Sequence, residues 1–213
     1  MEKQQFASRD LTAGQLNAIV KKLGGHEAAL KFLRGELSVS EPTRNWREKD
    51  GVIYFSVTSD GTTGEEWIAR LEGKGFRVAE DSKSVLRSED FKPTTGITTE
   101  VAVLKGMLFE NNERITKNIR KVAGDRKLET PNAEIACLIR EMFTDEEIKA
   151  MGLTWIIVMH EPIENTNGVP CLLRVFRGVG GLWLYPHRGE PDERYPRGSG
   201  GFAFAVSQVG TQN

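Results

Sequence analysis

The chain has 213 residues, and its 29 lysines and arginines almost balance its 30 aspartates and glutamates, so the formal net charge at pH 7 is -1. That balance excludes a whole-chain electrostatic attraction to nucleic acid or to an anionic membrane, and only a local basic patch could attract either. The length suits one large domain or two small ones, and it is enough to bury a core without disulfides or metals.

Cysteine content and the N-terminal segment indicate the compartment. Cys137 and Cys171 are too few for a disulfide framework and lie in apolar segments, so we expect reduced core thiols. The first residues, MEKQQFASRD, lack the apolar region of a signal peptide, and no apolar run is long enough to span a membrane. We therefore expect cytoplasmic residence, with surface display after non-classical export as the alternative.

The N-terminal part predicts two short helices. An apolar stripe over residues 11–23 follows Asp10, a good N-cap, and stops at Gly24 and Gly25; a second helix is predicted over residues 26–34. We expect this helical hairpin to pack on a sheet. The alternative is a helix-turn-helix whose basic residues contact phosphate.

A β-loop-α-β unit is predicted next. The strand VIYFSVTS (52–59) leads through the SDGTTG loop into a helix over residues 65–73 and a strand over residues 76–78. Backbone N–H groups of the Gly61 to Gly64 loop, at a helix N-terminus, can hold an anion. The loop lacks the Lys-Ser/Thr ending of a nucleotide P-loop and a three-glycine dinucleotide fingerprint, so an ordinary capped turn is the favoured interpretation.

The middle of the chain predicts one strand and three helices. The strand covers residues 99–104, and the first helix, residues 111–127, carries a cationic face beside a narrow apolar stripe. Such a face is usually solvated surface, but it is also a candidate for phosphate contact. Two further helices, beginning at Pro131 and after Thr144, lead into the next strand.

The C-terminal part predicts the best core strand. Residues 153–159 form a continuous apolar run, the pattern of a strand buried on both faces. In residues 201–206 large and small side chains alternate, which predicts its partner strand with one large-residue face turned inward. Short strands are expected at residues 171–176 and 182–185.

The polar and aromatic segment from residue 172 to 199 is the main functional candidate. Strands hold it at both ends, as binding loops are usually held, and its Trp, Tyr and Arg residues supply large contact areas with versatile polar edges. We expect a ligand-binding surface there. The expected binding residues are Arg174, Phe176, Arg177, Tyr185, His187, Arg188, Asp192, Arg194, Tyr195 and Arg197. The competing interpretation is half-buried aromatics beside solvated charges.

Catalytic chemistry has only weak candidates. His160 and Glu161, at a strand end, suggest an acid/base pair or half of a metal site, but adjacent residues on a strand point to opposite faces. His26 and His187 show no spacing that would complete a zinc site. We favour a hydrogen bond from His160 to a turn, and expect neither a metal nor a cofactor.

Several segments carry a resemblance: FLRGELSVSEP, DGVIYFSVTSDGTTGEEWIARLEGKGFRV, SVLRSEDFKPTTGITTEVAVLKGMLFENNERITKNIR and PNAEIACLIREMFTDEEIKAMGLTWIIVMHEPI. They resemble a family of uncharacterised proteins from Parcubacteria-like candidate-phylum bacteria. The C-terminal segment resembles the variable region of diversity-generating-retroelement proteins, whose C-type-lectin-like domain holds mutable residues on a fixed backbone. The resemblance implies display roles for the ten residues above and scaffold roles for Trp183, Phe202 and Phe204.

The segment departs from that pattern in three ways. It is short for a full lectin-like fold, it ends in GFAFAV where the lectin-like domains often end in Gly-Phe-Arg, and it has no disulfide or calcium motif.

We expect an α+β protein with an N-terminal α/β region (1–128) and a C-terminal β-rich ligand-display region (129–213), or one continuous domain. The expected function is non-catalytic recognition of a protein or glycan. The first alternative is a nucleic-acid-associated or hydrolytic protein that uses the SDGTTG loop, His160 and the basic helix 111–127. The second is a structural or assembly protein.

Overall fold

The computed structural model describes residues 12–38, 44–178, 181–195 and 198–207, and for Leu182 only the backbone. It contains helices together with a large mixed sheet, so the predicted α+β class is confirmed. Internal contacts divide the chain into two units, residues 1–44 and 45–213.

The first unit holds the predicted pair of helices, α1 (Ala13–Lys22) and α2 (His26–Leu33). The N-cap of α1 is Thr12, whose side chain accepts a hydrogen bond from the backbone N–H of Gln15 in a capping box. The predicted N-cap, Asp10, lies outside the described residues. Ala29 is the buried residue of the two helices.

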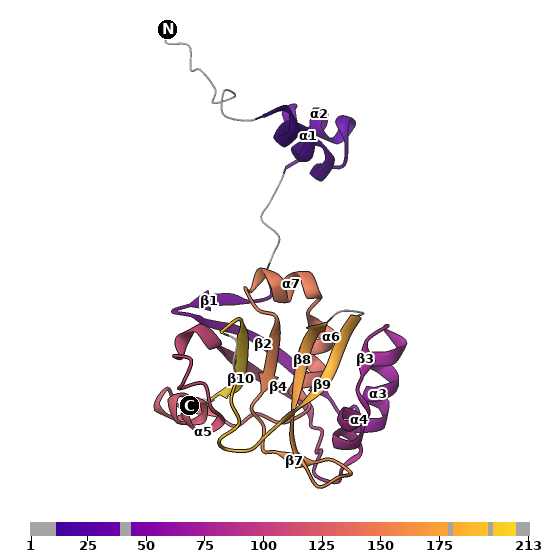
Figure 1. The fold of residues 1–213 in the computed structure, drawn as a ribbon. Coiled ribbons are helices and arrows are strands. Elements are labelled where there is room, and N and C mark those ends of the chain that lie inside the picture. The colour runs from indigo at the N-terminus through magenta and orange to yellow at the C-terminus, as the bar shows by residue number, and fades with distance from the viewer. Residues whose placement is uncertain (1–11, 39–43, 179–180, 196–197, 208–213) are drawn as a thin grey trace, which may run out of the picture. The chain divides into compact units, whose positions relative to one another are not determined.

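The second unit is organised around one sheet with the strand order β1-β2-β4-β10-β6-β8-β9-β3, to which β5 and β7 add short pairings on β10 and β8 (Figure 1). Its strands are β1 (Arg47–Lys49), β2 (Val52–Asp60), β3 (Arg77–Val78), β4 (Thr95–Lys105), β5 (Leu128–Glu129), β6 (Trp155–Val158), β7 (Ile163–Glu164), β8 (Pro170–Gly178), β9 (Gly181–Arg188) and β10 (Gly200–Val206).

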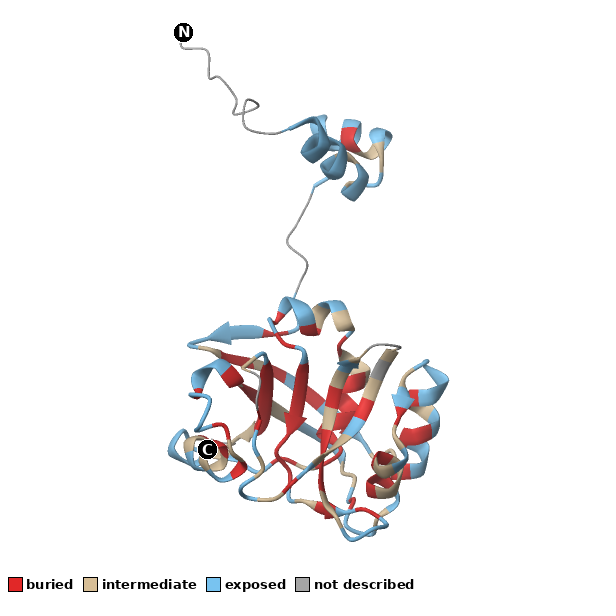
Figure 2. Cartoon of the chain, viewed as in Figure 1, coloured by how far each residue is buried: buried red, intermediate tan, exposed pale blue. Residues whose placement is uncertain are grey.

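Helices cover the two faces of this sheet unequally. The main core contains buried residues of four helices, and a second core, on the opposite face, contains Ile119 and Ala123 of one helix. The main-core helices are α3 (Gly64–Gly73), α4 (Glu80–Arg87), α6 (Ile135–Met142) and α7 (Asp145–Ala150). The second core has α5 (Thr116–Asp125), close in sequence to the 3-10 turn η1 (Gly106–Leu108). Figure 2 shows the centre of the sheet largely buried.

The centre of the sheet is formed by the two strands that the sequence analysis singled out. Every residue of β6 is buried, as predicted, and β10 pairs with it in parallel, Phe202 opposite Ile157. Phe202 and Phe204 enter the second core while Ala203 enters the main core. Both phenylalanines therefore occupy scaffold positions.

Strands from both sides of the predicted boundary near residue 128 belong to this one sheet. β10, from the C-terminal region, lies between β4 and β6 and also pairs with β5. The division by contacts instead falls between residues 44 and 45.

Three local predictions differ from the structure, and one of them is the helix expected from Pro131, which begins at Ile135. The helix expected from Asn111 begins at Thr116, because Ile115 is extended and its N–H bonds back to Glu113. The β-loop-α-β elements form, but β2 and β3 lie near opposite ends of the sheet. The two residues of β3 add only to the outer edge of β9, while the longer apolar strands take the centre.

Gly64, the first residue of α3, is required by close packing. A Cβ atom there would lie 1.7 Å from the carbonyl oxygen of Leu86 in α4. Gly73, the last residue of the same helix, has no atom within 4 Å of the corresponding position. The two glycines therefore differ in packing although they belong to one helix.

We predict that Gly64→Ala lowers the free energy of unfolding by about 1–3 kcal/mol, because α3 and α4 must separate to admit the methyl group. The control Gly73→Ala should leave stability unchanged or raise it by up to about 1 kcal/mol. Urea denaturation of both variants measures the difference. Equal midpoints would contradict the close approach of the two helices.

Candidate ligand-binding surface

The pairing of β8 with β9 places a set of large side chains on one face of the sheet. Leu173, Val175 and Leu184 enter the main core. Because side chains alternate along a strand, their neighbours point to the opposite face. There Arg174 is paired with Tyr185, and Phe176 with Trp183. We call this surface the arginine–aromatic face, consisting of Arg77, Arg174, Phe176, Trp183, Tyr185 and His187.

The arginines of this face lie over its aromatic rings. The guanidinium carbon of Arg174 is 4.8 Å from the ring centroid of Phe176 and 5.2 Å from that of Tyr185. Arg77 lies over Trp183 at 5.3 Å, and the rings of Trp183 and Tyr185 are 6.3 Å apart in an edge-on arrangement. Cation–π attraction of this kind orients each guanidinium without neutralising its charge.

Hydrogen bonding of Arg174 is incomplete. Its Nε is buried and finds no acceptor among the described residues, and burial lowers the pKa of the guanidinium from its ordinary value. No described acidic side chain forms an ion pair with Arg174 or Arg77. Tyr185 is 43% exposed. The face thus presents charge and aromatic area that the described protein does not use.

His187 lies at the covered end of the face. Its ring is 4.9 Å from the ring of Tyr195, and burial lowers the pKa of its imidazole. At neutral pH the ring is therefore uncharged, so the positive charge of the face comes from its arginines.

Other expected binding residues lie elsewhere. Arg177 and Arg188 are exposed, but alternation puts them on the opposite side of their strands. Asp192 pairs with Lys117 at 2.7 Å, and Arg194, exposed, forms a backbone bridge with Ile115.

Arg197 lies outside the described residues.

Tyr195 corrects the expectation of a display residue, because it is only 1% exposed. Its ring packs in the second core against Trp155 and Phe202, its hydroxyl hydrogen-bonds Thr116 at 2.9 Å, and burial raises its pKa to about 12. Tyr195 therefore acts as an apolar anchor, a buried ring that attaches the polar segment between β9 and β10 to the second core.

Arg114 holds the same anchor from the backbone side. It is 4% exposed and donates from Nε to the carbonyl of Tyr195 (2.9 Å) and from Nη1 to that of Phe109 (3.0 Å). The segment after β9 is therefore fixed to the turn before α5.

Trp183, expected to be a scaffold residue, and Arg77, which the sequence does not single out, both lie on the arginine–aromatic face. Trp183 is half-buried and Arg77 is exposed. The two-residue spacing of Trp183, Tyr185 and His187 was the available signal for the tryptophan. The pairing of β3 with β9, which brings Arg77 there, has no local signal because it joins segments about a hundred residues apart.

The basic face of α5 is engaged within the protein. Lys121 pairs with Asp125 at 2.9 Å, and Arg120 donates to the carbonyl of His160 at 2.6 Å. With Lys117 and Arg114 also held by partners, this face leaves little charge for a phosphate backbone.

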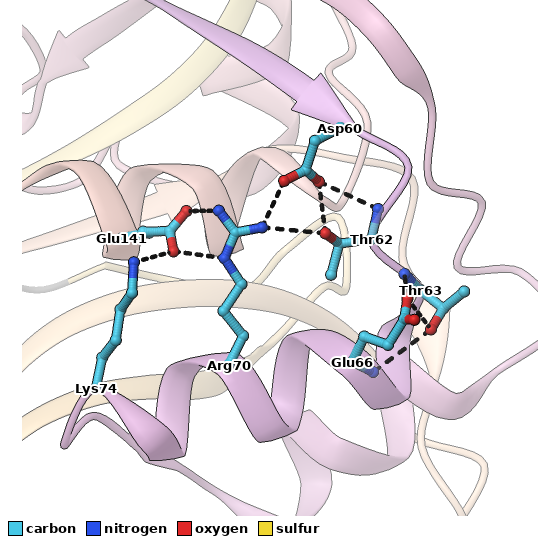
Figure 3. Close-up of polar contacts among 7 residues, drawn as sticks. All are labelled: Asp60, Thr62, Thr63, Glu66, Arg70, Lys74 and Glu141. Carbon is cyan, nitrogen blue, oxygen red and sulfur yellow. Dashed lines mark hydrogen bonds and ion pairs between the residues drawn. The ribbon is translucent and has the colours of Figure 1, made fainter.

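The SDGTTG loop uses its own carboxylates at the helix N-terminus (Figure 3). Glu66 accepts from the backbone N–H of Thr63 at 2.8 Å in a capping box, and Asp60 accepts from that of Thr62 at 3.1 Å. The N–H groups of Thr62 and Thr63 are therefore occupied by carboxylates of the protein itself, and that of Gly61 bonds the carbonyl of Thr94. The capped turn favoured from the sequence is confirmed.

Arg70 joins this loop to α6. It bonds Asp60 at 2.5 Å and binds Glu141 through two N–H groups, and Lys74 pairs with the same glutamate at 2.5 Å (Figure 3). Hydrogen bonds from Thr62 and then from Arg70 lower the pKa of Asp60 to about 2. The carboxylates are matched by cations, so the network stabilises the junction of β2, α3 and α6 and leaves no free general base.

His160 serves a structural role. Its Nε2 accepts from the backbone N–H of Leu173 in β8 at 2.9 Å and its Nδ1 donates to the carbonyl of Glu161 at 2.6 Å. The ring is hydrogen-bonded to the backbone as expected, but its partners lie in a strand and in the irregular segment after β6 and not in a turn. Burial lowers its pKa to about 4, so the ring is neutral at pH 7. A cavity of about 710 Å³ adjoins it, lined also by Lys92 and Asn132, but both ring nitrogens are already used.

Neither a cluster of three metal-ligating side chains nor a helix long and apolar enough to span a membrane is found in the part of the chain that the structure describes. Cys137 and Cys171 are buried, and burial raises the pKa of both thiols. Comparison with protein-family models, with curated proteins and with solved structures gives no match.

We predict that Tyr195→Ala lowers the free energy of unfolding by about 3–5 kcal/mol, because it removes a buried ring and leaves Thr116 without a partner. Tyr185→Ala, on the exposed face, should cost less than about 1 kcal/mol. Thermal and urea denaturation of both variants test this. Equal losses would contradict the separation of anchor from face.

We predict that Asp60 contributes to stability only above acidic pH. Its pKa falls from 3.8 to about 2 on folding, so its contribution is complete above pH 3.8 and is lost as the pH falls toward 2. The melting temperature of Asp60→Asn should lie below that of the wild type at pH 6, and the two should converge near pH 2. A difference that persists at pH 2 would contradict this assignment.

Proposed function

We propose that the protein is a non-catalytic binding protein that recognises a protein or glycan ligand with the arginine–aromatic face. The observation that carries this proposal is Arg174, whose guanidinium lies near two rings from two strands and whose buried Nε has no acceptor in the described part of the chain. Half-buried Arg, Tyr and Trp side chains are typical of residues that dominate binding energy. The competing sites support the proposal because their charges are satisfied internally.

The strand pairing that carries the arginine–aromatic face suits recognition of a ligand. β8 and β9 pair over eight residue positions, so the backbone beneath Arg174 and Tyr185 is held before a ligand arrives. A ligand would then lose little affinity to ordering of the protein. Beneath the face lies the main core, in which the thiols of Cys137 and Cys171 are buried.

The resemblance to retroelement variable proteins supports the same assignment. Positions 174, 176, 185 and 187 share the face, whereas positions 173, 175 and 184 are buried in the main core. Alternation along two strands thus separates residues that can change from residues that must not. From the resemblance to lectin-like domains, the proposal takes only the display of changeable residues on a fixed backbone.

We predict that the double variant Arg174→Ala/Tyr185→Ala loses at least about tenfold in affinity for ligands that the full-length protein binds on peptide and glycan arrays, because truncating an interface anchor commonly costs more than 1 kcal/mol. Arg177→Ala/Arg188→Ala is the matched control. It removes two arginines from the other side of the same strands and should bind within about twofold of wild type.

Two results would count against the proposal. One is a ligand whose affinity depends on Arg177 and Arg188 and not on the face. The other is a folded wild-type protein that binds nothing on either array.

A further inference from the structure

Resting on the proposed function, we infer that the ligand of the arginine–aromatic face is an extended acidic segment of a partner protein, with Asp or Glu carboxylates at alternate positions paired with Arg174 and Arg77. The inference concerns the chemistry of the partner. It rests on the charge of the face, on the use of its rings, and on their spacing.

Charge complementarity is the first step. Arg174 and Arg77 have no acidic partner among the described residues, in contrast to Arg70 and Arg87, which bind carboxylates elsewhere in the unit. A guanidinium remains protonated in proteins and presents a planar fork of N–H donors that fits a carboxylate. Since no described carboxylate pairs with either guanidinium, a ligand that brings carboxylates is favoured.

The rings favour a carboxylate over a base or a sugar ring. Tyr185 and Trp183 already have a guanidinium over them, at 5.2 and 5.3 Å. A ligand that binds by stacking needs the ring faces free, whereas a ligand that binds the guanidinium edge benefits from rings that hold it in place. Nucleic acid would also need further cations, and those of α5 are paired internally.

The spacing favours an extended segment. Arg77 is paired with Trp183 in the sheet and Arg174 with Tyr185, and these two aromatic residues are two positions apart along β9. The two ring centroids are 6.3 Å apart. An extended peptide repeats the side chains of one side about every 7 Å, which is close to the spacing of the two rings over which the guanidiniums lie, so we place its carboxylates at positions i and i+2.

The outer edge of β9 favours binding on the face. Ala79 donates its N–H to the carbonyl of Leu184, so this carbonyl points toward the outer edge of β9. Because the direction of the backbone groups alternates along a strand, Pro186 is the next residue whose backbone groups point to that edge. Proline has no N–H to offer to an added strand. A segment that approaches β9 beyond Leu184 is therefore guided to the side chains of the face and away from edge pairing.

The test uses the full-length protein and three blocked, fluorescent peptides. The first alternates glutamate with threonine, the second replaces each glutamate by glutamine, and the third has the same composition as the first with its glutamates adjacent. Anisotropy titration should show the alternating acidic peptide binding at least about tenfold more tightly than the glutamine peptide, because a hydrogen bond to a charged group contributes more than one between neutral groups. The adjacent-glutamate peptide should be weaker, because its neighbouring carboxylates point to opposite sides.

The protein variants locate the site. Arg77→Gln and Arg174→Gln should each weaken the alternating peptide by about tenfold, because each removes one ion-paired fork. Arg177→Gln should stay within about twofold. Arg77 is exposed, so its variant tests the inference even if Arg174→Gln unfolds the protein.

Three outcomes would overturn the inference: equal binding of the glutamate and glutamine peptides, no measurable binding of any peptide, or an oligothymidine competitor that binds the same face more tightly than the acidic peptide. The proposed function fails separately. An array ligand that needs Arg174 and Tyr185 but carries no acidic group would leave the proposed function standing and remove the acidic partner.

Discussion

The parallel pairing of β10 with β6 is the interaction on which the rest of the sheet depends. β10 joins the β1-β2-β4 side of the sheet to the β6-β8-β9-β3 side, so without it the unit would hold two separate sheets. Two glycines of β10 allow this strand to pack closely against its neighbours. A Cβ at Gly200 would lie 2.0 Å from the indole of Trp155, and one at Gly201 would lie 2.5 Å from Val103. The last described strand therefore completes a fold that begins near residue 45.

The sequence predicted the elements better than their arrangement. Apolar continuity in residues 153–159 and the large-small alternation after Gly200 identified both central strands, because burial on both faces leaves a local pattern. The separation of β2 from β3 leaves none. It depends on competition among strands for the centre of the sheet, and local periodicity does not report which strand wins.

The residues of the candidate site were also only partly predictable from the sequence. Residue type singled out Arg174 and Tyr185, and the two-residue period was enough to place them together once β8 and β9 were known to pair. Tyr195 was misassigned because a polar, glycine-rich segment predicts exposure, whereas the hydrogen bond to Thr116 and the support from Arg114 come from a segment about eighty residues earlier. Such contacts are properties of the fold, and no spacing within the loop indicates them.

Buried arginines show which positive charges the fold itself requires. Arg114 donates to several carbonyls, and Arg140, which is fully buried, donates to the carbonyl of Phe143 at 2.6 Å and pairs with Asp145. These hydrogen bonds offset part of the hydration free energy that each guanidinium loses on burial. Arg174 is half-buried, and among the described residues its guanidinium contacts rings and no carbonyl. Its Nε lacks an acceptor there, as does the Nε of Arg140, but Arg140 also donates to a carbonyl and pairs with a carboxylate. This difference separates the arginine–aromatic face from the internally compensated network around Arg70, and it is the reason for the proposal that a ligand supplies the acceptor.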